Sequence, residues 1–399
     1  MISIHFLLDL AIILLSTKLL GLITKKIHMP QVVGALLAGV IFGPALLNIV
    51  HETEFITKLA ELGVIVLMFA AGMETDLDEL KKCGKASLII AIIGVFVPLL
   101  GGYIVASVYT GDWGLGSLSS PVFLKNVFIG VILTATSVSI TVETLQELGK
   151  LKTSSGTAIM GAAVIDDIIG IVILTIVTGT ADSNVNLPVV LIKIVAFFVF
   201  AALCGILFYK LFNWLCKIQG PKRRFPIMAF VFCLLLAYVS EEWFGVADIT
   251  GAYVAGIVLS KTLHAEYINS KFEIISYMLL SPIFFAAVGL KITITSMDTN
   301  MIMFTATLLL VAILTKIIGC GLGAKMCKYS NDESLKIGIG MISRGEVALI
   351  VANKGASVGL MDDKFFAPII LIVIITTLIT PILLKIVYSK NSIKYSKAA

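Results

Sequence analysis

Thirteen long apolar runs constrain this chain more than any other feature of its sequence. Each is close to the roughly 20 residues that an α-helix needs to cross a bilayer. Only 14% of the 399 residues are charged and 58% are hydrophobic, whereas roughly a quarter of a soluble protein is charged. A soluble enzyme and a nucleic-acid-binding protein are therefore excluded, and we predict an all-α polytopic membrane protein of about 13 transmembrane helices. The runs are 4–24, 30–49, 57–73, 86–109, 124–146, 154–180, 186–216, 225–242, 246–264, 270–290, 300–325, 334–356 and 365–387.

Positive charge is divided unevenly between the two sets of predicted loops. If the N-terminus faces outward, twenty Lys and Arg residues fall in the inner loops and tail, and five fall in the outer loops. Cytoplasmic loops accumulate Lys and Arg, so we predict a multi-pass cell-membrane protein with its N-terminus outside and its C-terminus in the cytoplasm. The loops are short, and only a tail of 388–399 follows the last run. We expect a single membrane domain without a soluble regulatory domain.

Six charged residues lie deep inside the apolar runs. They are, in chain order, Glu143, Asp166, Asp167, Lys316, Arg344 and Glu346. A single charge at a helix centre costs at least roughly 2.5–3.5 kcal/mol on insertion scales, so these residues must pair, bind an ion or face water. Two cations neutralise only two of the four acids, and a buried carboxylate left over takes up a proton or binds a cation. This surplus favours an ion/proton exchanger over purely structural ion pairs, although either interpretation remains open for Glu143 and Arg344.

The two adjacent aspartates cannot address the same point. Neighbouring residues of a helix point about 100° apart. One of Asp166 and Asp167 is therefore expected to face a cation-binding cavity, while the other meets a basic side chain from another helix. Lys316 is the best candidate for that partner, because a buried lysine shifts its pKa readily and can release its proton.

Two of the runs contain residues that disfavour a continuous helix. The fifth includes the segment 134–140 of hydroxyl-bearing, small and β-branched residues, and the twelfth includes glycines and Ser343 in its first half. These runs lie seven spans apart, as do the sixth and thirteenth and the fourth and eleventh. We therefore predict two inverted six-helix repeats (about 4–180 and 225–387) joined by a linker helix (186–216), with crossed discontinuous helices.

Several segments together resemble a known family. They are ATSVSIT and LQELGKL within 135–151, GAAVIDDIIGI at 161–171, LTKIIGCGLGA around Lys316, SRGEVALI at 343–350, GALLAGVIFGPALL at 34–47 and SPIFFAAVGLKI at 281–292. In order, spacing and topology the whole chain is similar to the cation:proton antiporters, in the monovalent cation:proton antiporter-2 branch with the bacterial NapA/GerN-type Na⁺/H⁺ antiporters.

The resemblance implies a homodimer in which each chain has a dimerisation domain and a mobile core domain that carries the ion. Asp167 is expected to bind Na⁺ and to be protonated when the site is empty. Asp166 is expected to form a salt bridge with Lys316 that takes part in proton coupling. Thr136 and Ser137 would supply oxygen ligands, and the resemblance places Arg344 and Glu346 in supporting roles on the second broken helix.

We therefore predict a Na⁺(Li⁺)/H⁺ antiporter that works by alternating access. The exchange is electrogenic if Lys316 and Asp166 contribute a second proton, and electroneutral if Lys316 stays protonated. The chain has no C-x-x-C pair and no histidine spacing typical of metal ligands, so we expect no cofactor besides the transported ions. K⁺/H⁺ exchange remains the main alternative, because cation choice depends on cavity size and ligand number. An intramembrane aspartic protease is disfavoured, since its two acids converge from separate helices.

Overall fold

The computed structural model describes residues 4–26, 29–75, 77–113, 120–181, 187–218, 224–291 and 298–396, and this part of the chain is helical apart from its turns and loops. The first helices are α1 (His5–Lys26), α2 (Gln31–Phe42), α3 (Glu54–Glu74), α4 (Leu77–Thr110), α5 (Pro121–Thr134), α6 (Val138–Glu147) and α7 (Ser154–Ala181). The remaining ones are α8 (Leu187–Ile218), α9 (Arg224–Glu242), α10 (Asp248–Leu259), α11 (Ala265–Ile275), η1 (Ser276–Leu280), α12 (Ser281–Leu290), α13 (Thr299–Met326), α14 (Asn331–Gly340), α15 (Glu346–Ser357), η2 (Asp363–Phe365) and α16 (Phe366–Ser396).

Each of the thirteen predicted runs contains at least one helix in the part of the chain that the structure describes. Ten correspond to helical segments that are long and apolar enough to cross a membrane, and the other three contain the shorter apolar helices Gln31–Phe42, Asp248–Leu259 and Val347–Ala356. The polytopic all-α prediction is therefore confirmed. The orientation of the termini stays a prediction.

Several of the predicted boundaries differ from the observed ones; α4, for example, begins at Leu77, well before the predicted run 86–109. The run 30–49 is helical only as far as Phe42, because Gly43 and Pro44 follow and the residue before a proline is disfavoured in the helical conformation. The helix α16 continues to Ser396, so most of the predicted tail 388–399 is helical, and its place in the cytoplasm stays a prediction. No glycine or proline follows Pro381 to end that helix.

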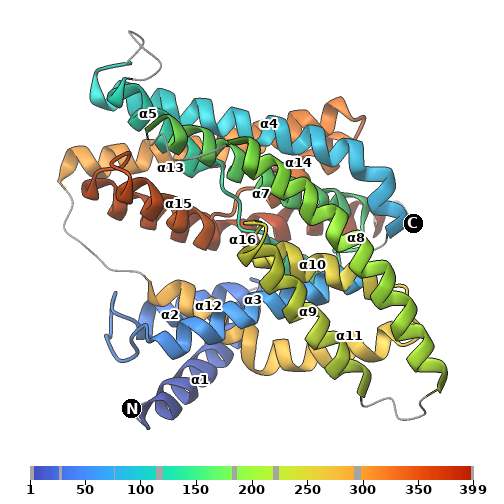
Figure 1. Cartoon of the computed structure of the whole chain (residues 1–399). Helices are drawn as coiled ribbons and strands as arrows, with labels where there is room; N and C mark the ends of the chain where they lie inside the picture. Colours follow the sequence, from blue (N-terminus) through green and yellow to red (C-terminus); the bar gives the residue numbers. More distant parts are fainter. Residues whose placement is uncertain are drawn as a thin grey trace.

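The helices form two groups, one above the other in Figure 1. In the upper group α4 packs along α13, α5 and α7, and α14–α16 join them; in the lower group α10 packs on α3 and α9, and α2 packs on α1 and α12. The helix α8 runs from one group to the other and contacts both α7 and α10. Direct contact between the groups is made chiefly by α6, which touches α2 and α3, and by α16, which touches α2.

Two glycine crossings hold the lower group together in the same way. A Cβ on Gly39 of α2 would lie 2.8 Å from the Cα of Gly289 of α12, and one on Gly256 of α10 would lie 2.9 Å from the Cα of Gly72 of α3. The glycines end similar sequences, GALLAG (34–39) and GAYVAG (251–256). Spans two and nine, seven apart in the chain, thus make equivalent contacts, which supports the predicted division into repeats.

We expect Gly39→Ala to destabilise the protein. The added Cβ meets the backbone of Ala286 and Gly289, which cannot move aside as a flexible side chain can. Overpacking of this kind costs about 1–3 kcal/mol, measurable as a lower midpoint of thermal unfolding in detergent. Gly170→Ala on α7 is the control, since nothing lies within 4 Å of its added Cβ. Equal midpoints for the two variants would contradict the close crossing.

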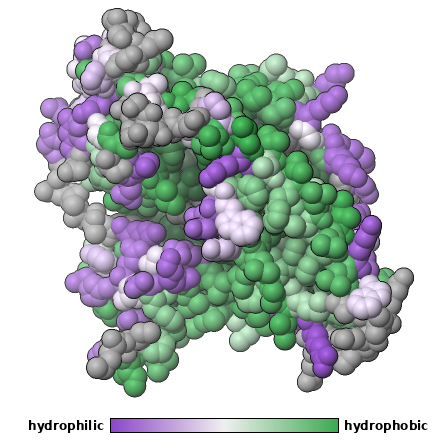
Figure 2. All heavy atoms as spheres, viewed as in Figure 1, coloured by the Kyte–Doolittle hydropathy of each residue, from purple (hydrophilic) through white to green (hydrophobic). Residues whose placement is uncertain are grey.

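The outer surface of the bundle is apolar over a broad area. Figure 2 shows hydrophobic side chains over the face on which α8 and α9 lie, with polar side chains towards the margins. On α8, Ile192, Leu203 and Leu207 are each more than 60% exposed. A continuous apolar surface of this kind requires lipid or another apolar surface against it.

Candidate functional site

The fifth span is broken near its middle, as the sequence predicts. The helix α5 ends at Thr134, residues 135–137 are extended, and α6 begins at Val138. Thr136 and Ser137, the two predicted oxygen ligands, lie in this extended segment and are almost completely buried. Hydroxyl side chains here compete with the helix for backbone hydrogen bonds, which accounts for the break.

The twelfth span is broken as well, and its break meets that of the fifth. Residues 341–345 separate α14 from α15, and the Ser137 N–H donates to the Ser343 carbonyl at 2.7 Å. Thr141 of α6 donates to the Gly340 carbonyl at the end of α14, also at 2.7 Å. A Cβ on Gly345 would lie 2.5 Å from Ser137 Oγ, so only glycine allows this approach. The predicted pair of discontinuous helices is therefore confirmed, and the two breaks cross in contact.

A buried ion pair lies beside the crossing. The ammonium of Lys316 on α13 donates to Asp166 Oδ1 of α7 at 3.0 Å, and both side chains are at most 1% exposed. This is the partner that the sequence predicts for one of the two aspartates. Losing either partner would leave an uncompensated buried charge, which is strongly destabilising.

Asp167 has different surroundings from Asp166. It is only partly buried, whereas Asp166 is 2% exposed. The next residue of a helix points about 100° away, so Asp167 does not share the direction of the Lys316 pair. Asp166 is thus paired with a base, while the expectation that Asp167 faces a cation-binding cavity stays a prediction.

Arg344 is buried at the second break, but among the described residues its guanidinium binds backbone carbonyls. It donates to the Ile342 carbonyl and, at 3.2 Å, to the Ala312 carbonyl of α13. The residue is 1% exposed. Arg344 therefore stabilises the irregular backbone of the crossing, which favours the structural interpretation that the sequence left open.

Glu143 lines a cavity away from the ion pair. The cavity has a volume of about 520 Å³ and lies between α6 and the lower group, with Glu74, Glu147 and Glu273 also on its wall. The Glu147 carboxylate accepts the N–H of Gln31, at the start of α2, at 2.8 Å. The side chain of Glu346 lies outside the described residues. Among the described side chains, no contact brings Glu143 to the aspartate pair.

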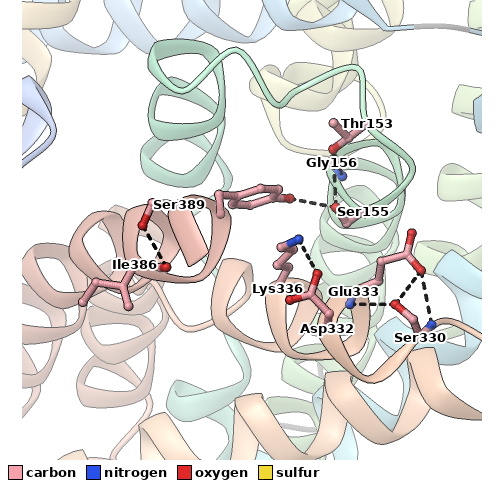
Figure 3. Close-up of polar contacts among 10 residues, drawn as sticks. Thr153, Ser155, Gly156, Ser330, Asp332, Glu333, Lys336, Ile386 and Ser389 are labelled. Carbon is pink, nitrogen blue, oxygen red and sulfur yellow. Dashed lines mark hydrogen bonds and ion pairs between the residues drawn. The ribbon is translucent and has the colours of Figure 1, made fainter. Parts of the chain in front are cut away.

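Polar contacts hold the start of α7, the start of α14 and the end of α16 (Figure 3). Ser155, at the start of α7, is 2.8 Å from the hydroxyl of Tyr388 on α16, and Lys336 of α14 forms an ion pair with Asp332. Ser330 and Glu333 form a capping box at the start of α14. Burial raises the pKa of the Tyr329 phenol above its usual range.

The sequence analysis missed the threonines of α16. Thr376 and Thr377 are buried against Arg344, and their hydroxyls bond to its backbone. A run of hydroxyl residues at 376, 377 and 380 in the thirteenth span was the available signal. It carries no charge, and it therefore does not stand out among membrane-buried residues as the aspartates do.

Two crossed, broken helices beside a buried carboxylate–ammonium pair define a membrane transporter of ions. The family model described as "Sodium/hydrogen exchanger, transmembrane" matches residues 11–390. The chain belongs to this family, whose members are secondary transporters and not enzymes.

Relatives agree with this assignment over the full length. The chain is 41% identical over 388 residues to the Na⁺/H⁺-K⁺ antiporter GerN of Bacillus cereus, covering 96% of each. It is 36% identical over 380 residues to a Na⁺/H⁺ antiporter of Enterococcus hirae, covering 94% of this chain and 96% of the other. The solved structure of the sodium proton antiporter MjNhaP1 of Methanocaldococcus jannaschii shares the fold, with a TM-score of 0.69 at 19% identity over 96% of this chain and 97% of that one.

Proposed function

We propose that the protein exchanges Na⁺ or Li⁺ for H⁺ across the cell membrane by alternating access. The observation that carries this proposal is the buried Lys316–Asp166 pair next to Asp167, at the crossing of two broken helices. A cation and a proton compete for Asp167, and either one neutralises it. Because a neutral site crosses an apolar barrier at lower cost than a charged one, exchange is coupled.

We assign the other predicted residues supporting roles. Thr136 and Ser137 supply oxygen ligands from the first break, and the Lys316–Asp166 pair takes part in proton coupling. Glu143 lies on the acidic wall of the cavity at the inner end of α6 and attracts cations there. Arg344 and Glu346 support the second break. The transported ions are substrates, and we propose no cofactor.

The two groups of helices suggest how the site moves. We assign the upper group (α4–α7 and α13–α16) as the mobile core domain and the lower group (α1–α3 and α9–α12) as the dimerisation domain of a homodimer. Few contacts join the groups, which is what a moving core requires. The N-terminus lies outside and the C-terminus in the cytoplasm.

Potassium is the second candidate substrate. The name of the Bacillus cereus relative includes K⁺ beside Na⁺, and that relative is 41% identical to this chain. K⁺ in place of Na⁺ would leave the proposed site and coupling unchanged.

The test is proton flux in proteoliposomes, reported by a pH-sensitive dye as Na⁺, Li⁺ and K⁺ are added separately. We expect responses to Na⁺ and Li⁺. A response to K⁺ alone would keep the mechanism and overturn the substrate. Silence to all three, with folded protein shown by its thermal unfolding, would contradict the proposed function.

A further inference from the structure

The second helix break buries backbone polar groups that the regular hydrogen bonds of α14 satisfy only in part. Residues 341–344 lie between α14 and α15 and are at most 1% exposed. Inside a membrane protein every such group needs a partner from within the protein. The hydrogen-bond partners of the Arg344 backbone therefore determine how stable the conformation of the break is.

Two adjacent threonines of α16 bind the backbone N–H and the backbone carbonyl of Arg344. The Thr376 hydroxyl accepts the Arg344 N–H at 3.2 Å and itself donates to the Ile372 carbonyl at 2.7 Å. The Thr377 hydroxyl donates to the Arg344 carbonyl at 2.6 Å. A hydroxyl can donate and accept at once, so Thr376 fills both roles. Both side chains are at most 1% exposed.

This use of threonine differs from the common one in membrane helices. A threonine usually donates to the carbonyl four residues earlier in its own helix. Thr380, one turn further along α16, does so with the Thr376 carbonyl at 2.7 Å and is equally buried. Thr377 instead donates to a residue 33 positions away.

The side chain of Arg344 carries this contact to the ion pair. Its guanidinium donates to the Ala312 carbonyl at 3.2 Å. In an α-helix the N–H of Lys316 donates to that same carbonyl, four residues earlier. The guanidinium thus holds the turn of α13 that presents the Lys316 ammonium to Asp166.

The repeat pattern gives the threonine pair a counterpart. In the predicted repeats the thirteenth span, which contains IITTLI (374–379), corresponds to the sixth, which contains VIDDII (164–169). In the first repeat the pair is acidic and lies beside a base. In the second repeat the pair consists of Thr376 and Thr377, whose hydroxyls bind the backbone at the break of the twelfth span.

We propose that Thr376 and Thr377 are positioning residues for cation exchange: they fix Arg344, which holds the Lys316 turn in place opposite Asp166. The inference rests on the proposed function. When the hold is loosened, the Lys316 ammonium leaves Asp166 and competes with Na⁺ for the neighbouring Asp167. The protein then binds Na⁺ more weakly, although the aspartates are intact.

The test compares three variants in proteoliposomes, with Na⁺-dependent proton flux measured against Na⁺ concentration. Thr377→Val keeps the shape of the side chain but removes its donor, and we expect the Na⁺ concentration for half-maximal flux to rise roughly tenfold. Thr377→Ser keeps the donor and retains the wild-type value. Thr380→Val is the matched control, since it removes a buried hydroxyl that bonds within α16, and it retains the wild-type value too.

A merely structural role predicts a different result. It lowers the maximal flux per protein and leaves the half-maximal Na⁺ concentration unchanged. That result for Thr377→Val, or equal shifts in the Ser and Val variants, would overturn the proposal while the exchange function stands. If Thr377→Val yields no folded protein, Thr376→Val, which removes the acceptor for the Arg344 N–H, is measured instead and must raise the same value. No Na⁺-dependent flux in the wild type would overturn both proposals.

Discussion

Asp167→Asn is expected to abolish Na⁺-dependent proton flux. The substitution preserves the size of the side chain but removes the charge that a cation and a proton compete for. An amide neither binds Na⁺ as a carboxylate does nor exchanges a proton near neutral pH. Dye-reported flux in proteoliposomes, at matched amounts of folded protein, measures the effect. The ion pair of Lys316 involves Asp166 and is left intact, so the variant is expected to fold.

The same substitution elsewhere provides the control. Asp362 pairs with Lys125 at 2.7 Å, with both side chains more than 40% exposed. An exposed pair contributes about 0–1 kcal/mol, so Asp362→Asn is expected to exchange ions as the wild type does. Retained Na⁺-dependent flux in Asp167→Asn would remove this residue from the site.

Lys316→Gln has the second-largest expected effect, and it acts on both stability and coupling. It leaves the carboxylate of Asp166 buried without its partner, which costs about 3–5 kcal/mol. If the pair contributes the second proton, the wild type moves one net charge per cycle, worth about 2.3 kcal/mol per 100 mV. At a membrane potential of about 100 mV, that energy supports roughly a fortyfold additional Na⁺ concentration gradient. The flux of the variant, where it persists, no longer responds to an imposed potential.

The double variant Asp166→Asn/Lys316→Gln separates the two effects. Replacing both partners by neutral groups of similar size removes the uncompensated charge, so the unfolding temperature is expected to recover. The response to voltage is not expected to recover. Voltage-dependent flux in Lys316→Gln equal to that of the wild type would show that the pair contributes no proton to the cycle.

The sequence predicts the features that the membrane environment constrains most strongly. Each span needs a long apolar run, and buried charges such as Asp166 and Lys316 need partners of opposite charge. Their pairing could therefore be predicted from charge and location, and the broken helices from the hydroxyl run at 134–140 and the glycines of the twelfth span.

Features whose energy depends on three-dimensional contact could not be predicted in this way. The carbonyls of Ile342 and Ala312 that the Arg344 guanidinium binds could not be identified from the sequence. Glu143 counted with the buried charges, yet it lines a separate cavity. Thr377 carries no charge, and only the fold brings it within 2.6 Å of the Arg344 carbonyl. The similar sequences GALLAG and GAYVAG contain Gly39 and Gly256. They identify these two glycines as helix crossings only when the contacts in the structure are known.

Uphill movement of sodium tests the central claim most directly. Proteoliposomes with an acidic interior are placed in dilute labelled Na⁺, with the membrane potential held near zero by a permeant anion. Coupled exchange at Asp167 predicts that Na⁺ accumulates inside above its outer concentration as protons leave, and that Asp167→Asn accumulates none. Sodium that enters the wild-type vesicles only until the two concentrations are equal would contradict exchange, since it would show a passive path through the membrane.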